Sequence, residues 1–180
     1  MPMKKTREQR LAEKLKKAKD AERAERIYAE KFMRKALSQA GVAERKGEVP
    51  IGCVIVKDGK VIACGHNQRE TKRLATAHAE IFAINAACKK LGDWRLNGCD
   101  IFVTLEPCFM CAGAIANARI SRVYFGAYER KGGACGSVYN VVENSGLNSN
   151  ATVVGGILQE DCSSAITNFF ENKRNKISNS

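Results

Sequence analysis

Two β-rich runs joined by a tight-turn dipeptide constrain the fold of this chain more than any other feature. The segment IGCVIVKDGKVIACGHN, residues 51–67, has apolar and β-branched residues on both sides of Asp58-Gly59. An Asp-Gly pair between such runs is typical of a two-residue hairpin loop, because both residues tolerate a positive φ. The sequence therefore predicts an antiparallel hairpin, and Gly47 and Pro50 end the helical pattern that precedes it.

Helical and strand patterns alternate along the rest of the chain. The predicted helices cover residues 27–46, 77–91, 108–118 and 160–174, with a short helical piece near 138–142. The predicted strands after the hairpin cover residues 100–104, 122–126 and 152–157. Crossovers of the strand–helix–strand type favour parallel pairing. We therefore expect an α/β fold with one five-stranded mixed sheet flanked by helices.

The N-terminal segment differs in composition from the rest of the chain. Residues 1–26 are rich in Lys, Glu, Arg and Ala, and residues 1–35 hold 13 Lys and Arg against 6 Asp and Glu, or +7 of the chain's net charge of +11. We predict a basic helical or disordered extension over 1–26, one folded domain over 27–176 and a polar tail over 177–180. The extension is either a charged helix in water or a basic arm that touches RNA.

The cysteines and the apolar runs bear on cellular location. No run approaches the ~18–20 apolar residues that a membrane-spanning helix needs, and the charged opening residues lack the apolar stretch of a secretory signal. We therefore expect a cytoplasmic protein, in which the eight cysteines stay reduced. Spacing singles out Cys108 and Cys111, which form a CxxC pair.

Two predicted helix starts carry the residue types of a metal site. His78-Ala79-Glu80 opens one helix and PCFMC, residues 107–111, opens the next, with a strand between them. A CxxC pair at a helix start places both sulfurs beside free N–H groups, which favour thiolates. With His78 as a nitrogen ligand, this Cys2His set leaves one tetrahedral position open for water, as catalytic zinc sites do.

Glu80 distinguishes a catalytic site from a structural one. At a helix entrance its carboxylate can lie beside the metal, accept a proton from water and return it to a leaving group. A CxxC pair alone can also be a redox pair, and a structural zinc normally has a fourth Cys or His. His66 is the one histidine left over, either as a fourth ligand or as a residue that lines the pocket or packs.

The combination of HxE and PCxxC resembles the signature of the cytidine deaminase superfamily. Longer blocks such as TAHAEIFAI, WRLNGCDIFVTLEPCFMCAGAI and ARISRVYFGA are similar to the bacterial tRNA-specific adenosine deaminases, over about residues 27–176. The resemblance implies a three-layer α/β/α fold, one zinc ion per subunit and a homodimer. It also implies conversion of adenosine to inosine at the wobble position of a tRNA anticodon.

The same resemblance implies roles for individual residues. His78, Cys108 and Cys111 match the zinc ligands, Glu80 matches the proton shuttle, and Pro107 precedes the ligand pair in the segment beside the metal-bound water. The positions that match contacts to the flipped nucleotide or the anticodon loop are Asn67, Arg69, Lys131, Asn148, Phe170 and Arg174. For Phe170 the alternative is packing of the last helix against the core.

The chain departs from the family pattern at two places near the RNA. Glu129 stands where the family usually has Asp, next to the nucleotides that flank the base, and Asn148-Ser149-Asn150 replaces a more basic turn.

Two other functions stay open. One is a zinc deaminase of free nucleobases or nucleosides, such as guanine or cytosine, and the other is a non-catalytic RNA-binding module with a structural zinc, against which Glu80 argues.

Overall fold

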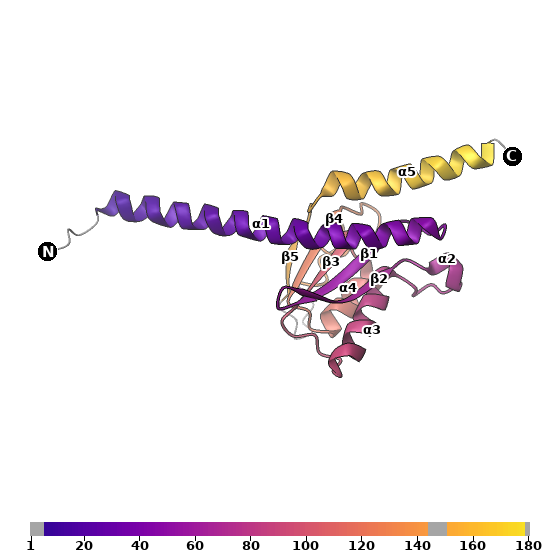
Figure 1. Ribbon diagram of the computed structural model, residues 1–180, viewed down its shortest axis with the longest axis horizontal. Helices are drawn as coiled ribbons and strands as arrows, with labels where there is room; N and C mark the ends of the chain where they lie inside the picture. Colours follow the sequence, from indigo (N-terminus) through magenta and orange to yellow (C-terminus); the bar gives the residue numbers. More distant parts are fainter. Residues whose placement is uncertain (1–5, 144–150, 179–180) are drawn as a thin grey trace.

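A single mixed sheet lies between two layers of helices in the computed structural model, which describes residues 6–143 and 151–178. The helices are α1 (Arg7–Arg45), α2 (Arg69–Lys72), α3 (Ala79–Leu91), α4 (Phe109–Asn117) and α5 (Gln159–Ser178). The strands are β1 (Gly52–Lys57), β2 (Lys60–His66), β3 (Cys99–Leu105), β4 (Arg122–Ala127) and β5 (Thr152–Val154). α1 and α5 lie on one side of the sheet and α3 and α4 on the other (Figure 1).

The sheet has the mixed topology that the sequence predicts. Its order is β2-β1-β3-β4-β5, with β1 antiparallel to β2 and β3, and β4 parallel to β3 and β5. Asp58 and Gly59 form the hairpin turn with φ values of 49° and 69°, the left-handed backbone that a two-residue loop requires. The expected fold of a five-stranded sheet flanked by helices is confirmed.

Each face of the sheet has its own apolar core. Between the sheet and α1, Phe32 and Met33 are buried against Phe102 and Tyr124, whose rings stack at a centroid distance of 4.5 Å. On the opposite face, side chains of α3 and α4 pack against the other sides of β1, β3 and β4. The two cores hold the sheet rigidly between its helices, and this positions the strand ends and helix starts that meet at one edge.

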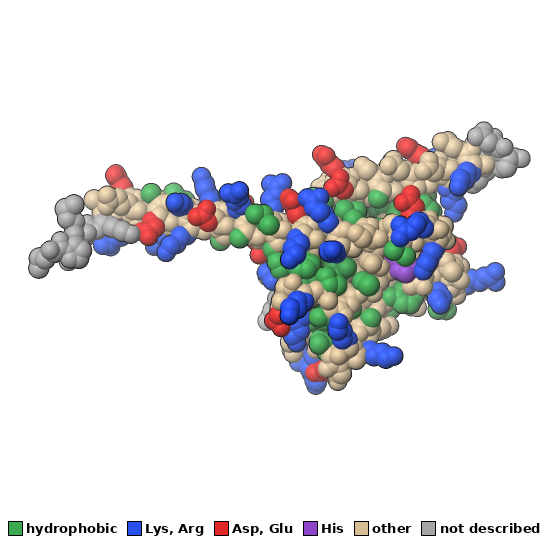
Figure 2. All heavy atoms as spheres, in the orientation of Figure 1, with side chains coloured by type: hydrophobic (Ala, Val, Ile, Leu, Met, Phe, Trp, Pro, Cys, Tyr) green, Lys and Arg blue, Asp and Glu red, His purple; other side chains and the backbone are tan. Residues whose placement is uncertain are grey.

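The first helix is much longer than the 27–46 pattern predicts. It runs without a break from Arg7 to Arg45 and begins with a capping box, in which Thr6 and Gln9 satisfy each other's backbone N–H groups. Its first part extends well beyond the sheet (Figure 1). The side chains of residues 7–24 are exposed, and both blue and red side chains lie along this part of the helix (Figure 2).

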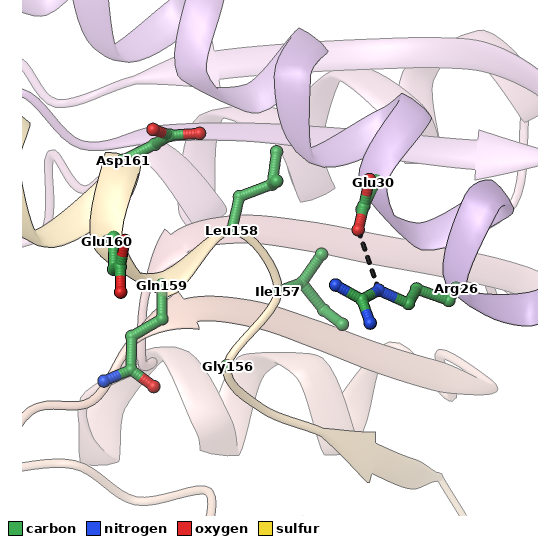
Figure 3. Close-up of a pocket in the computed structure, with 8 residues that line it drawn as sticks. All are labelled: Arg26, Glu30, Gly156, Ile157, Leu158, Gln159, Glu160 and Asp161. Atoms are coloured by element: carbon green, nitrogen blue, oxygen red, sulfur yellow. Dashed lines mark hydrogen bonds and ion pairs between the residues drawn. The ribbon is translucent and has the colours of Figure 1, made fainter.

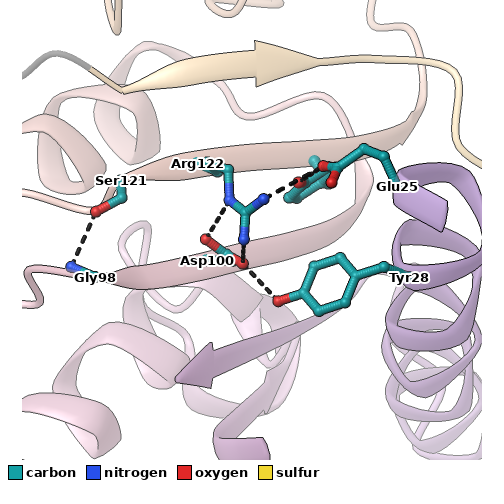
Figure 4. A network of polar contacts seen from close by, with 7 residues as sticks. Glu25, Tyr28, Gly98, Asp100, Ser121 and Arg122 are labelled. Carbon is teal, nitrogen blue, oxygen red and sulfur yellow. Dashed lines mark hydrogen bonds and ion pairs between the residues drawn. The ribbon is translucent and has the colours of Figure 1, made fainter. Parts of the chain in front are cut away.

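A polar network joins the extended part of α1 to the sheet (Figure 4). Arg122 on β4 donates to Asp100 on β3 at 2.6 and 2.8 Å, and Tyr28 on α1 donates to the same carboxylate at 2.5 Å. Glu25 accepts from Tyr124 and lies 3.4 Å from Arg122. Because Asp100 is buried and charge-paired, this network fixes where α1 leaves the sheet.

Two local predictions differ from the structure. The predicted helical piece near 138–142 is wrong: residues 133–141 form a looped segment in which Cys135 and Asn140 make an isolated bridge. The buried carboxylate of Glu106 accepts from the backbone N–H groups of Cys135 and Ser137, which holds the segment out of a helix. The short helix α2 was not predicted.

No helix in the described ranges 6–143 and 151–178 combines the length and the apolar character that crossing a membrane requires.

Candidate active site

Two helices begin side by side at the edge of the sheet where β2 and β3 end and β1 begins. His78 is the N-cap residue of α3 and Cys108 the N-cap residue of α4, and both have extended backbone. Their side chains therefore leave the chain just before each helix and point off its end. A Cβ at Gly65 on β2 would collide with the carbonyl oxygen of Ala79, so only glycine lets the start of α3 approach the sheet this closely.

The three predicted ligands converge. Nδ1 of His78 lies 3.7 Å from the sulfur of Cys108 and 3.6 Å from that of Cys111, and all three atoms lie within 4.8 Å of one another. Zinc–sulfur and zinc–nitrogen bonds of ordinary length at a tetrahedral angle place these atoms about 3.6 Å apart. No other His, Cys, Asp or Glu among the described residues joins the group. The donor set is thus compatible with a metal ion.

The electrostatics of the two thiols favour a bound cation. Hydrogen bonds from Cys111 and His78 lower the pKa of Cys108 to about 4. The hydrogen bond to Cys108, together with burial, raises the pKa of Cys111. The first thiolate therefore opposes the second, and a cation between them removes that repulsion, as metal binding to a CxxC pair requires.

Glu80 lies beside this cluster with its side chain enclosed. It is 4% exposed and lines the same cavity as His78 and Cys108. Burial raises the pKa of its carboxyl group, because the charged form loses hydration. A carboxyl group with a raised pKa holds a proton more readily than a free one, so it can both take up and release a proton during a reaction.

A cavity of about 330 Å³ opens above these residues, a volume within the range of small-ligand sites. Seven of the residues predicted for the site line it: Asn67, Arg69, His78, Glu80, Cys108, Glu129 and Phe170. Val49, Ile51, Leu105 and Ile166 supply an apolar wall. The cavity combines an apolar slot with a few polar groups, and this suits a flat heterocycle with polar edges.

Other predicted residues lie outside the lining of this cavity. Cys111 is buried beneath it as part of the metal cluster, and Pro107 is buried, its carbonyl accepting from Ala134 N–H. Lys131 and Arg174 are exposed. Asn148 falls outside the described residues.

The positions of Phe170 and His66 bear on two alternatives that the sequence left open. Phe170 is 41% exposed and lines the cavity, whereas the neighbouring Phe169 turns toward a separate groove beside Glu44. Phe170 therefore does not pack into the core. His66 joins neither the metal cluster nor the cavity lining, and its Nε2 lies 3.0 Å from the Lys46 ammonium nitrogen.

Two buried carboxylates around the cavity were not predicted from the sequence. Glu48 is fully buried and Glu106 is 2% exposed. Glu106 lines the cavity and accepts from the backbone N–H groups of Glu129, Cys135 and Ser137, which fixes the loop carrying Glu129. The signal in the sequence is an acidic residue at the margin of an apolar run, in GEVPIG and in VTLEPC.

A second groove, of about 450 Å³, lies between α1 and the start of α5 (Figure 3). Acidic side chains border it, with Glu30 paired to Arg26 at 3.0 Å on one side and Glu160 and Asp161 on the other. It is larger than the cavity above the metal cluster but contains none of the cluster residues. The donor set, and not the size of the opening, identifies the candidate active site.

The fold and the His-Cys-Cys cluster define a deaminase with the cytidine deaminase-like fold. The model of the MafB19-like deaminase family matches residues 27–174. The tRNA-specific adenosine deaminase of Bacillus subtilis (strain 168) is 48% identical over 147 residues, which cover 82% of this chain and 91% of the relative. The chain therefore belongs to the MafB19-like deaminases and to the tRNA-specific adenosine deaminases.

Two solved structures are similar to this chain. One from a study of A-to-I editing by tRNA:A34 deaminases at the wobble position of transfer RNA is 44% identical, covers 74% of this chain and 97% of that chain, and has a TM-score of 0.71. A guanine deaminase from Bacillus subtilis is also 44% identical, but the match covers 55% of this chain and 64% of the other, with a TM-score of 0.53.

Proposed function

We propose that this protein hydrolyses the 6-amino group of the wobble adenosine in a tRNA anticodon, giving inosine and ammonia. The observation that carries the proposal is the His-Cys-Cys cluster beside buried Glu80, at one cavity of a chain that belongs to the tRNA-specific adenosine deaminases. The substrate assignment follows from the relatives, since the wobble adenosine is the position that the similar structure's deaminases edit.

His78, Cys108 and Cys111 are the residues that would hold one zinc ion per subunit. Their separations of 3.6 and 3.7 Å fit a tetrahedral ion, and their two sulfurs and one nitrogen are donors that zinc prefers. When bound, zinc makes a water molecule nucleophilic at neutral pH by lowering its pKa to ~7. The carboxylate of Glu80 is not a ligand in this assignment, so it stays available for proton transfer.

Glu80 would move the protons of the reaction. Its carboxylate accepts a proton from the attacking water as the oxygen bonds to C6 of the purine, and passes it to the ring nitrogen N1. The same carboxylate then takes the proton of the C6 hydroxyl group and passes it to the exocyclic amine, and the C6–N bond breaks as the C6=O bond forms, releasing ammonia and inosine. The enclosed position of Glu80 and its raised pKa support this role.

The remaining lining residues would hold the extruded nucleotide. Reaching C6 requires the base to leave its stack and enter a pocket. Asn67 offers an amide to the base or its sugar, Glu129 lies beside the entrance, and Phe170 offers an exposed ring for stacking. The basic and polar residues proposed to contact the anticodon loop are Arg69, Lys131, Asn148 and Arg174. The backbone at Pro107 is proposed to border the reacting water.

The resemblance also supports two statements about the working enzyme. We propose that it acts as a homodimer, in which both subunits contribute near each active site, and that it works in the cytoplasm, where tRNA is its partner. We keep the domain division at 26/27 and 176/177 as a prediction.

A second candidate is the deamination of a free purine such as guanine. The similarity to a guanine deaminase favours it, although that match covers little more than half of this chain. A third candidate is a non-catalytic RNA-binding module with a structural zinc. It does not account for the buried carboxyl group of Glu80 beside the metal cluster.

Deamination of an anticodon stem-loop tests the proposal. Stem-loops with adenosine at the wobble position, matched stem-loops with that adenosine moved one nucleotide away, and free adenosine, cytidine and guanine are each incubated with the zinc-loaded protein. We expect adenosine to be read as guanosine on sequencing at the wobble position alone. Turnover of free guanine without editing of the stem-loop would instead assign the protein to the second candidate, and no turnover of any substrate would favour the third.

A further inference from the structure

Glu48 is a fully buried carboxylate whose partners all belong to the segment that follows β2. It accepts from the N–H of Thr71 at 2.6 Å, from the Thr71 hydroxyl at 2.6 Å and from the N–H of Glu70 at 3.2 Å. Its fourth partner is Nδ2 of Asn67 at 3.4 Å. Three of these contacts go to Glu70 and Thr71, which do not line the cavity. The fourth goes to the side chain of Asn67, which does.

The contact with Glu48 fixes which way the Asn67 amide faces. Asn67 is 6% exposed, so little room is left for solvent around the group. An ionised carboxylate only accepts hydrogen bonds, whereas an amide has a donating nitrogen and an accepting oxygen. Turning the amide by 180° would place its oxygen against the carboxylate of Glu48, two acceptors with no proton between them. The amide nitrogen therefore faces Glu48, and Oδ1 with the second N–H hydrogen remains for the cavity.

We propose that Glu48 is a positioning residue for the deamination reaction, which holds the Asn67 amide in one of its two orientations so that the cavity presents a fixed pattern of acceptor and donor to the nucleotide. This inference rests on the proposed function, because it takes Asn67 as a substrate contact. A fixed pattern matters because a polar group built to pair with one edge of a substrate rejects a substrate whose edge does not match.

Glu48 also has a structural role, so the experiment must separate the two. We compare Glu48→Gln, Asn67→Ala and the double variant in a double-mutant cycle, with kcat/KM on the wobble stem-loop as the measure. Gln keeps the size of Glu and can still accept from Thr71, but its amide can face Asn67 with either end. The matched control is Asp100→Asn, which alters another buried carboxylate that contacts Arg122 and Tyr28 and not Asn67.

We expect Glu48→Gln to lower kcat/KM about 10- to 100-fold, the range that misplacing a substrate-orienting group produces. In the Asn67→Ala background the same substitution is expected to change kcat/KM less than twofold, since no amide is left to position. Asp100→Asn, in contrast, is expected to change kcat/KM by the same factor in both backgrounds. If the fold reduction in kcat/KM of the double variant equals the product of the reductions in Glu48→Gln and Asn67→Ala, Glu48 acts on the fold alone and the proposal is overturned.

A spectroscopic measurement keeps the proposal testable if Glu48→Gln is poorly folded. The side-chain NH2 signals of Asn67, assigned by their loss in Asn67→Ala, report the orientation of the amide. Thr71→Val removes one hydrogen bond to Glu48 and leaves Glu48 and Asn67 in place. We expect one sharp NH2 pair, protected from exchange, in the wild type and in Thr71→Val. An unprotected pair in the wild type would contradict the inference, and a wild type that edits no stem-loop would instead count against the proposed function.

Discussion

The sulfur of Cys111 lies 3.6 Å from Nδ1 of His78, although the two residues are 33 positions apart and belong to different helices. The sheet brings them together, because β3 carries the chain from the end of α3 to the start of α4 and both helices begin at the same edge. A site built in this way from helix entrances has free N–H groups around it and a strand end beneath it. Its geometry therefore depends on the packing of the helices against the sheet.

Removing one sulfur should remove the metal. In Cys108→Ala only two ligands remain, so we expect zinc content to fall to near zero, with loss of activity and a lower melting temperature, since metal binding adds to the free energy of folding. Metal content by mass spectrometry and thermal unfolding measure this. Cys64→Ala, which alters an exposed cysteine on β2, is the matched control and should keep its zinc. A zinc-loaded, active Cys108→Ala protein would contradict the ligand assignment.

Removing the carboxylate of Glu80 should separate metal binding from turnover. We expect Glu80→Ala to keep its zinc and to lose activity by about 10²- to 10⁴-fold, the usual contribution of a general acid–base group. Glu160→Ala removes an exposed carboxylate at the start of α5 and serves as the control. The test measures the rate of inosine formation together with the zinc content of each variant. Equal rates in Glu80→Ala and the wild type would refute the proton-transfer role.

The elements that the sequence predicts well are those that short segments determine by themselves. Asp58-Gly59 defines its hairpin, and the HxE and CxxC motifs lie at the starts of α3 and α4 as expected. The errors arise where distant contacts decide. The segment near 138–142 has apolar residues at helical spacing, but Glu106, which follows β3, binds the N–H groups that precede the segment and holds it in a loop.

The site residues that the sequence did not reveal are those with backbone partners. Metal ligands are recognisable because their chemistry requires particular residue types at particular spacings. Glu106 binds mainly backbone N–H groups and Glu48 binds two of them, and a backbone partner leaves no trace in the sequence. The continuous α1 was also underestimated, because its first part has no buried side chains to produce a periodic pattern.

Gly65 should be essential for the position of the metal site. A methyl group there would collide with the carbonyl oxygen of Ala79, so we expect Gly65→Ala to displace the start of α3 and to cost about 1–3 kcal/mol of stability, as overpacking does. Zinc affinity should fall with it, because His78 precedes Ala79. Gly113→Ala is the matched control: nothing lies within 4 Å of its added carbon in α4, and it should stabilise by about 0.5–1 kcal/mol. Urea unfolding and zinc titration distinguish the two variants.

The stabilising effect of Glu48 should depend on pH in a defined direction. Burial alone would raise the pKa of Glu48, but hydrogen bonds from Thr71 and Glu70 and the charge of Arg69 hold it below its usual value of 4.5. A carboxyl group with a lowered pKa stabilises the folded state above its unfolded pKa, and this is lost as the pH falls through the folded pKa. The difference in unfolding free energy between wild type and Glu48→Gln should therefore be constant from about pH 7 to pH 5 and shrink below 4.5. A constant difference at lower pH would contradict the lowered pKa.

The protruding part of α1 should contribute little to binding of the anticodon. Acidic side chains lie among its basic ones on the face that Figure 2 draws, so this face is not a continuous positive surface. The C-terminal end of α1 is the end nearest the cavity, since Glu48 follows it and contacts Asn67, and residue 22 lies about 35 Å back along the helix axis. We therefore expect deletion of residues 1–22, which retains Glu25 and its contacts, to leave the affinity for a wobble stem-loop and its dependence on salt unchanged. A smaller salt dependence after the deletion would show that the extension binds phosphates, and it would assign the segment to a basic RNA-binding arm instead of a solvated helix.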